Sequence, residues 1–236
     1  MRIALIGYGK MGKEIEAAAL SAGDTIVQKF DIDRPADAAS LKDAEVCIEF
    51  STPQTVVANI QVALKAQKDI VVGTTGWYDQ VPELKKLVVN SGLLYSANFS
   101  VGVNLYFRIV AAAAELMRNE SDYDPYVHEL HHRQKADSPS GTALRVAEIL
   151  MKRIDRKKTI ATQRMDGKIA PDALHVTSTR VGTFAGTHTA GFDSEADLIE
   201  ITHTARSRRG FALGALRAAH WLHGRKGVYT MDDVDL

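Results

Sequence analysis

The sequence has a single cysteine, no excess of charge of either sign and no long hydrophobic run. Cys47 lies in the apolar segment Val46–Ile48, which predicts a buried strand residue, and one cysteine cannot form an internal disulfide. No apolar run approaches the ~20 residues that span a bilayer. Met1–Ile6 leads straight into a glycine turn rather than a signal peptide. We therefore expect a cytoplasmic protein without a membrane partner.

Charge excludes a further class of partners. The chain has 29 basic and 29 acidic side chains, so it has no general attraction for nucleic acid or for an anionic membrane, and we expect neither partner. A local basic pocket is still compatible with this balance. The 236 residues, 45% of them hydrophobic, are enough for one large domain or two modest ones with real cores.

A glycine-rich segment follows the first predicted strand. Arg2–Ile6 predicts a buried strand, and Gly7-Tyr8-Gly9-Lys10-Met11-Gly12 comes directly after it and opens a helix. In this context Gly-x-Gly-x-x-Gly predicts a dinucleotide-binding turn. The glycines allow a tight turn, a close approach of backbone to pyrophosphate, and close packing of helix on strand. An ordinary glycine-rich turn is the alternative.

Asp31 follows the second predicted strand, Thr25–Phe30, and lies about 20 residues beyond the last glycine of that turn. An acid in this place bonds the ribose hydroxyls of the cofactor and favours NAD. Lys29 and Arg34 flank it, however, and could hold the 2′-phosphate of NADP. The sequence thus leaves both NADH and NADPH open, and a solvated turn residue is the alternative for Asp31.

The alternation of strands and helices continues to about residue 95. Strands are expected at Glu45–Phe50, Ile70–Val72 and Leu93–Tyr95, with helices at Pro53–Ala66 and Val81–Val89. This alternation predicts a doubly wound parallel sheet, which binds ligands at the carboxyl ends of its strands. Turns without a ligand are the alternative for the small polar residues that follow two of these strands. The residues expected to face the cofactor there are Ser51, Gly73, Thr74 and Thr75.

The pattern changes at Ala97–Asn104, which we interpret as a hinge or crossover loop. Runs of strands beyond it predict a second, α+β domain with an open mixed sheet. We assign residues 1–102 and 209–236 to the dinucleotide-binding domain, and residues 103–208 to a substrate-binding and oligomerisation domain. Helices are expected at Leu105–Met117, Thr142–Arg153 and Gly210–His223, strands at Tyr126–His131, Leu174–Val181, Gly186–Phe192 and Asp197–Ala205, and a short tail at Val228–Met231.

The segment His128–Ala143 combines two adjacent histidines, a lysine and a Ser-Gly-Thr turn before a helix. Ser140 is a candidate N-cap, and the first N–H groups of that helix would form an anion site. Lys135 adds a positive charge, and a histidine can donate a proton near neutral pH. The segment predicts a pocket for a small carboxylate beside a proton donor. A plain cap, or a surface or metal-binding histidine pair, is the alternative, although no cluster of ligands completes a metal site.

The stretch Glu129–Ala143 closely resembles the central motif of dihydrodipicolinate reductase, the 4-hydroxy-tetrahydrodipicolinate reductase of bacterial lysine synthesis. The resemblance covers nearly the whole chain. Two departures bear on the nucleotide preference. The segment after Asp31 is short, and Ile32 stands where many members carry Arg. Further support comes from Gly7–Gly12, Gly73–Gly76, Ala97–Asn104, Gly186–His188 and Ile201–His203.

The resemblance implies a Rossmann domain, a substrate domain that builds a homotetramer, and NAD(P)H-dependent reduction of a small dicarboxylate. It implies His131 as the proton donor, with Lys135 supporting it and the substrate, and it leaves the roles of Arg180 and His188 open. The residues expected to hold the substrate carboxylates are His132, Lys135, Ser140, Gly141 and Thr142. The residues expected at the cofactor are Gly7, Gly9, Lys10, Met11, Gly12, Asp31, Ser51, Gly73, Thr74, Thr75, Ala97, Asn98 and Phe99.

Two other functions use similar features. A semialdehyde dehydrogenase has the same two-domain plan but needs a cysteine nucleophile in a loop, whereas Cys47 lies within a predicted strand. An NAD(H)-binding redox-sensing regulator would need a partner surface or a DNA-binding module, and no basic helix-turn-helix is visible in the sequence. Fold alone excludes neither of them.

Overall fold

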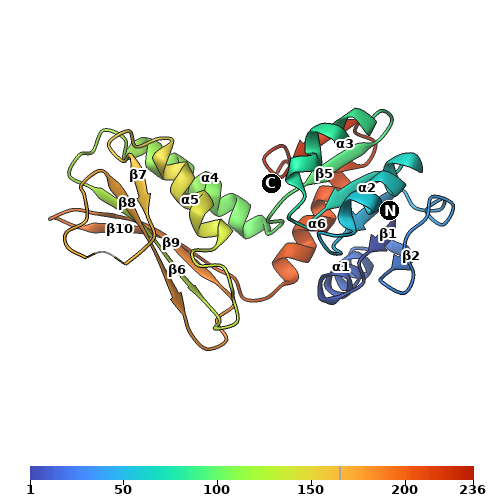
Figure 1. Ribbon diagram of the computed structural model, residues 1–236, viewed down its shortest axis with the longest axis horizontal. Coiled ribbons are helices and arrows are strands. Elements are labelled where there is room, and N and C mark those ends of the chain that lie inside the picture. Colours follow the sequence, from blue (N-terminus) through green and yellow to red (C-terminus); the bar gives the residue numbers. More distant parts are fainter. Residues whose placement is uncertain (165) are drawn as a thin grey trace. The chain divides into compact units, whose positions relative to one another are not determined.

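The computed structural model describes residues 1–164 and 166–236 and divides into two compact units (Figure 1). The first contains Met1–Asn104 and Arg208–Leu236, and the second contains Leu105–Ser207. Helix α4 (Val101–Leu116) crosses the first boundary, so the interpretation of residues 101–104 as loop was wrong. The helix starts there because the hydroxyl of the preceding Ser100 accepts the N–H of Val103 at 3.3 Å.

A six-stranded sheet with all its pairs parallel forms the centre of the first unit, which confirms the predicted Rossmann-type fold. The strand order changes direction between β1 and β3, where doubly wound sheets bind their ligands. The predicted C-terminal tail supplies the edge strand β11. In spatial order the strands are β11 (Gly227–Thr230), β5 (Gly92–Tyr95), β4 (Asp69–Val72), β3 (Val46–Glu49), β1 (Arg2–Ile6) and β2 (Thr25–Phe30).

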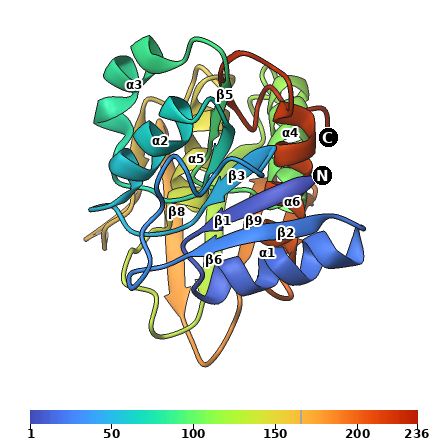
Figure 2. The same ribbon diagram turned by 90° about the vertical axis from the view of Figure 1, so that its right-hand side faces the viewer.

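Helices cover both faces of this sheet. One core contains residues of α1 (Lys10–Ser21) and α6 (Arg209–Leu222), and the other contains residues of α2 (Val56–Lys65) and α3 (Val81–Leu87). Figure 2 shows α1 and α2 on opposite sides of the strands. Helix α2 begins later than predicted, because the carbonyl of Thr52 first accepts N–H groups in a turn. A short 3₁₀ turn precedes α3. Strands buried on both faces explain the continuous apolar runs in the sequence.

The second unit contains a five-stranded mixed sheet, which confirms the predicted α+β character of this part. Strand β6 is parallel to β8 and antiparallel to β9, and the edge strand β10 is antiparallel to β9. Strand β7, parallel to β8, was not predicted, because three residues are too few for a periodic pattern. In spatial order the strands are β10 (Leu198–Thr204), β9 (Thr187–Asp193), β6 (Asp124–His131), β8 (Ala173–Arg180) and β7 (Thr159–Ala161).

Helices α4 and α5 (Gly141–Met151) lie on one face of the mixed sheet (Figure 1), and their apolar side chains share one core with it. Alternation along β6 puts Val127, Glu129 and His131 on this buried face. The carboxylate of Glu129 and the imidazole of His131 therefore lie on the same buried face of β6 as the apolar side chain of Val127. Among the described residues, none of the helices has the length and apolar character needed to cross a membrane.

The backbone of helix α6 packs directly against the backbone of the loop after β5. A Cβ added to Gly214 would lie 1.6 Å from the carbonyl oxygen of Phe99, whereas one added to Gly210, on the same helix, would meet nothing closer than 3.5 Å. We predict that Gly214→Ala lowers the free energy of unfolding by about 1–3 kcal/mol through overpacking. Gly210→Ala is the matched control and should be neutral or slightly stabilising. Urea unfolding of the three proteins tests this, and equal midpoints would contradict the close approach.

Candidate active site

The glycine turn after β1 has the geometry of a dinucleotide cradle. Gly7 has a φ of +91°, and a Cβ added there would lie 2.2 Å from the carbonyl oxygen of Phe50. A Cβ added to Gly12 would lie 2.5 Å from the carbonyl oxygen of Gly7, so α1 packs directly on the turn. Gly9 caps α1 and has no side chain to bond its first N–H groups. These features fit a pyrophosphate bound at the start of a helix.

The other predicted cofactor residues follow strands that end at the same edge of the sheet. Backbone hydrogen bonds connect these ends in turn: Phe50 N–H to Ile6, Gly73 N–H to Glu49, and Ser96 N–H to Val72. The structure thus brings together the turns after β1, β3, β4 and β5. Lys10, Thr75, Ala97 and Asp31 are exposed, and Met11, Ser51, Gly73 and Asn98 are half-buried.

Two of these residues lie deeper than the prediction required. Phe99 is buried, and its ring lies 5.8 Å from that of Phe50, so its backbone is the part available to a ligand. Thr74 is also buried, and its hydroxyl has no hydrogen-bond partner. The hydroxyl of Ser51 lies 2.9 Å from that of Thr55 and accepts from Asn59 at 3.1 Å. The cofactor roles of all three stay predictions.

The cations beside Asp31 are already engaged. The ammonium group of Lys29 lies 2.5 Å from the carboxylate of Glu16, and the guanidinium of Arg34 donates to Gln28 at 2.9 Å. The carboxylate of Asp31 accepts the N–H of Ile32 at 3.0 Å. A paired lysine offers less net charge to a 2′-phosphate than a free one. This arrangement reduces the positive potential that the sequence suggested for NADP.

Glu49 is a polar residue of this edge that the sequence reasoning missed. It is fully buried at the end of β3, paired in register with Ile6, and one of its oxygens has no hydrogen-bond partner. Burial raises the pKa of its carboxyl group, although hydrogen bonds from Ser51 and Asn59 oppose this. An acidic residue in an otherwise apolar strand was the available signal.

In the second unit the predicted proton donor and the predicted helix cap lie close together. His131 is the last residue of β6, and its side chain is 9% exposed. Ser140 is the N-cap of α5, as predicted, and its hydroxyl accepts the N–H of Ala143 at 3.2 Å. In the loop between them, the ammonium of Lys135 lies 2.7 Å from the carboxylate of Asp137.

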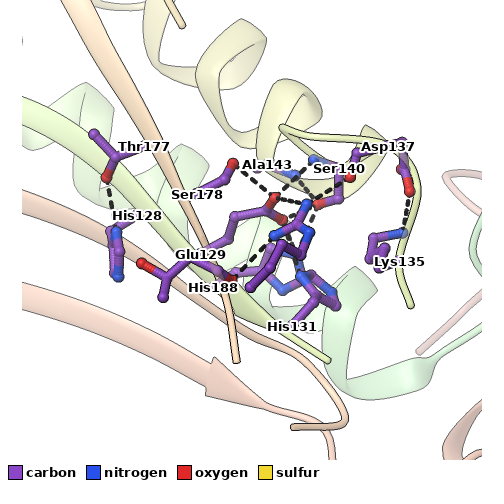
Figure 3. Close-up of polar contacts among 12 residues, drawn as sticks. His128, Glu129, His131, Lys135, Asp137, Ser140, Ala143, Thr177, Ser178 and His188 are labelled. Atoms are coloured by element: carbon purple, nitrogen blue, oxygen red, sulfur yellow. Dashed lines mark hydrogen bonds and ion pairs between the residues drawn. The ribbon is translucent and has the colours of Figure 1, made fainter. Parts of the chain in front are cut away.

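The centre of the cluster is Glu129, to which the sequence reasoning assigned no role (Figure 3). Its side chain is fully buried. One carboxylate oxygen accepts from the N–H of Ser140 at 2.9 Å, from the hydroxyl of Ser178 at 2.9 Å, and from the guanidinium of Arg180 at 2.8 Å. The other oxygen accepts from the hydroxyl of Ser140. The anion at the tip of α5 is thus a carboxylate of the protein itself.

Strand register explains this convergence. The parallel pairing of β6 with β8 sets Glu129 beside Ser178, and the antiparallel pairing with β9 sets it beside His188. Neighbours across strands share a face of the sheet. Nε2 of His188 lies 3.4 Å from the second oxygen of Glu129, and Nδ1 of His131 lies 3.2 Å from the same oxygen. The two imidazole rings meet edge to face, with centroids 5.0 Å apart.

Burial and charge set the protonation of this cluster. Burial alone would raise the pKa of Glu129, but hydrogen bonds from His188, Ser140 and Arg180 outweigh it and hold the pKa well below its usual range. Burial lowers the pKa of His131 to about 4, and although Glu129 raises it, neighbouring cations oppose protonation. His131 is therefore neutral near pH 7 in the absence of a ligand, whereas a bound dianion would favour its protonated form.

The remaining predicted substrate residues surround this cluster. Gly141 is exposed at the first turn of α5, and a Cβ added there would meet no described atom within 4 Å apart from its chain neighbours and the helix backbone, so space is open beside it. Thr142 and His132 are half-buried. Burial raises the pKa of Asp137, but its hydrogen bond with Lys135 outweighs this and lowers it. A ligand carboxylate at Lys135 would exchange places with that of Asp137.

One atom each from Glu129, His131 and His188 lies within 4.8 Å of the others, a spacing that a metal ion could use. Both oxygens of Glu129 already accept hydrogen bonds from Ser140 or Arg180, and the guanidinium repels a second cation. We assign no metal to this cluster.

Two family models cover almost all of the sequence. The model of the dihydrodipicolinate reductase N-terminus matches residues 1–99, and that of the C-terminus matches residues 102–234. The chain belongs to the dihydrodipicolinate reductase family. This confirms the resemblance that the motif Glu129–Ala143 indicated.

Similar proteins with this enzyme name support the same family assignment. The chain is 38% identical over 236 residues to the 4-hydroxy-tetrahydrodipicolinate reductase of Christiangramia forsetii, covering 99% of this chain and 97% of the relative. It is 37% identical to that of Archaeoglobus fulgidus, covering 99% of both chains. The fold matches a dipicolinate-bound dihydrodipicolinate reductase from Paenisporosarcina sp. TG-14 with a TM-score of 0.80 at 22% identity, covering 100% of this chain and 99% of that one.

The lowered pKa of His131 predicts a pH dependence of stability. The group titrates near 6.5 when unfolded and about 4 when folded, so its contribution is complete above pH 6.5 and is lost as the pH falls toward 4. Between about pH 7 and pH 5 the wild-type protein should lose about 2 kcal/mol through this group. His131→Gln should lack that loss, and His128→Gln, on the same strand, should keep it. Urea unfolding at both pH values measures it, and equal losses in wild type and His131→Gln would contradict the assignment.

Proposed function

We propose that this protein reduces 4-hydroxy-tetrahydrodipicolinate, or the dehydrated dihydrodipicolinate, to tetrahydrodipicolinate with NADH or NADPH in diaminopimelate and lysine synthesis. The observation that carries the proposal is the cluster in the second unit: an imidazole, an ammonium group and the start of a helix within one family motif. Cys47 argues against a semialdehyde dehydrogenase, because it is fully buried and burial raises the pKa of its thiol to about 12. No specific feature favours a regulator.

The substrate is a dianion, so binding it is mainly a problem of charge. Lys135 supplies a cation, and its side chain is 25% exposed. The backbone of Gly141 and Thr142 at the start of α5 supplies dipoles directed at an anion. We assign the substrate carboxylates to these groups together with His132. Ser140, predicted from the sequence to contact them as well, instead donates both its N–H and its hydroxyl to Glu129. Arg180, bound to Glu129 at 2.8 Å, adds positive potential without needing to contact the ring.

The cofactor residues belong to the first unit. The glycine turn fits a pyrophosphate, because side chains at Gly7 and Gly12 would collide with backbone atoms. When bound, the nicotinamide supplies the hydride, which we assign to C4 of the substrate ring. We assign the rest of the cofactor to the turns after β3, β4 and β5, and its ribose hydroxyls to Asp31.

His131 supplies the proton. Reduction at C4 leaves an enamine whose C3 needs a proton, and a positioned general acid accelerates such a step by roughly 10²–10⁴-fold. The free enzyme holds His131 neutral at pH 7, since its pKa is about 4. The two substrate carboxylates oppose the nearby cations and raise that pKa, so the acid forms when the substrate is present.

We further propose a homotetramer built on the mixed sheet of the second unit, and a cytoplasmic location suited to a biosynthetic enzyme. The edge strand β10 supports such an assembly, since Leu198 and Ile199 are 49% and 39% exposed. Exposed apolar side chains along one strand are a common basis of protein–protein contact.

The proposal is tested by an assay with substrate generated from pyruvate and aspartate semialdehyde. We expect purified protein to oxidise NADH or NADPH only when both precursors have been condensed, followed by the loss of nicotinamide absorbance. Aspartate semialdehyde with NAD+ or NADP+ and phosphate is the control for the dehydrogenase alternative, because a dehydrogenase would oxidise the aldehyde and raise the nicotinamide absorbance. Failure to oxidise either cofactor with the ring substrate, by protein shown to be folded, would refute the proposed activity.

His131→Gln tests the assignment of the proton donor. We predict that kcat falls by about 10²–10⁴-fold, because the general acid is lost, whereas KM changes much less. His128→Gln is the matched control: this histidine lies on the same strand but bonds Thr177 at 2.7 Å instead of the cluster. Steady-state kinetics of the three proteins decide the matter, and a near-normal kcat in His131→Gln would exclude it as the acid.

A further inference from the structure

Glu129 is a buried ionised group without a part in the chemistry described so far. A buried carboxylate is costly unless it is paired and hydrogen-bonded, and Glu129 is fully buried. Four donor groups of Ser140, Ser178 and Arg180 meet it. An apolar residue would suit the adjoining core better, so a carboxylate in this place calls for an explanation beyond packing.

The two nitrogens of His131 have different surroundings. Nδ1 is buried, forms no hydrogen bond, and lies 3.2 Å from the carboxylate of Glu129. Nε2 is directed at Gly186, where an added Cβ would lie 2.8 Å away. The absence of a side chain at Gly186 therefore keeps space beside Nε2. One nitrogen has an anion beside it, and the other has room beside it.

We propose that Glu129 is a positioning residue that keeps a proton on Nδ1 of His131, so that Nε2 is the nitrogen that carries the transferred proton. This inference rests on the proposed function and deepens it. A carboxylate within 3.2 Å of one ring nitrogen favours the tautomer that carries its proton on that nitrogen. Hydrogen bonds from Ser140, Ser178 and Arg180 fix the position of the Glu129 carboxylate. The orientation and tautomer of the His131 ring are therefore set by the carboxylate.

The proton transfer balances with these groups alone. In the acid form, both nitrogens of His131 carry a proton. The Nε2–H bond breaks as the enamine electron pair forms the new C–H bond at C3 of the substrate. The imidazole is left neutral with its Nδ1 proton facing Glu129, and solvent restores the proton on Nε2. Glu129 remains ionised throughout.

Charge gives Glu129 a second effect on the same step. Among the described groups that act on His131, Glu129 is the anion that favours protonation, whereas the others oppose it. Without this anion, the cations would hold His131 neutral to lower pH. The charged and titratable groups around His131 are Glu129 on the same strand, Arg180 on β8, His188 on β9 and Lys135 in the loop before α5.

A purely structural role is the competing explanation, since Glu129 also holds the N-cap of α5 through Ser140. The two roles differ in what they do to titration. Loss of a helix cap lowers the stability of the protein. If it also lowers activity, it does so by the same factor at every pH value. Loss of an anion beside a general acid also moves the pH at which the acid loses its proton.

The decisive variants are Glu129→Gln and Glu129→Asp. In Glu129→Gln we expect kcat to fall by about 10–10²-fold with a much smaller change in KM, and the alkaline limb of the kcat profile to shift about one pH unit lower. Glu129→Asp keeps the charge, so its alkaline limb should stay near that of wild type even if kcat is reduced. Ser178→Ala, which removes one donor and leaves the carboxylate, should not move the limb either. An unshifted limb in Glu129→Gln would overturn the inference.

A measurement on the wild-type protein without substrate tests the tautomer directly. Nitrogen-15 NMR of the histidine rings should show neutral His131 with its proton on Nδ1, the less common tautomer of free histidine, identified by its absence from His131→Gln. A proton on Nε2 would overturn the inference. Failure of the wild-type enzyme to reduce the ring substrate, with the Nδ1 tautomer present, would instead refute the proposed function.

Discussion

The second unit depends on one buried carboxylate being fully compensated. Glu129 connects three strands and a helix: β6 carries it, β8 supplies Ser178 and Arg180, β9 supplies His188, and α5 supplies Ser140. An uncompensated charge in this place would cost several kcal/mol, so these elements have one favourable arrangement. The same arrangement puts an imidazole, a guanidinium and a helix start within a few ångströms of each other. The stability of this unit and the geometry of the candidate site have the same origin.

Much of the fold could be predicted because strong periodicity and glycine turns determine it locally. Arg2–Ile6 with the glycine turn gave the first βα unit, and the buried strands of the parallel sheet were located within one or two residues. The start of α4 was misplaced because Ser100 and Val101–Asn104 look like a polar and glycine-containing loop, while a hydroxyl cap decides the helix start. Three-residue strands such as β7 leave no periodic signal.

The candidate site was predictable only in part, for a physical reason. The motif named the residues that lie together in sequence, Lys135 and Ser140 among them. The residues that hold them come from other strands, and only register brings Ser178, Arg180 and His188 to Glu129. The alternation of buried and half-buried residues along β6 did indicate one residue of the site. Glu129 falls between Val127 and His131 on the buried face, where an acidic residue is unusual. A single sequence does not specify which strands pair.

The segments of the two units alternate along the chain, which has a consequence for biosynthesis. Leu105–Ser207 form one continuous stretch, so the mixed sheet and its helices can assemble as soon as they leave the ribosome. The first unit must wait, because α6 and β11 complete its core and its sheet edge and are translated after the second unit. Until then, the apolar face of β3, β4 and β5 that α6 covers is exposed, and the unit that contains His131 can form before the unit that contains the glycine turn.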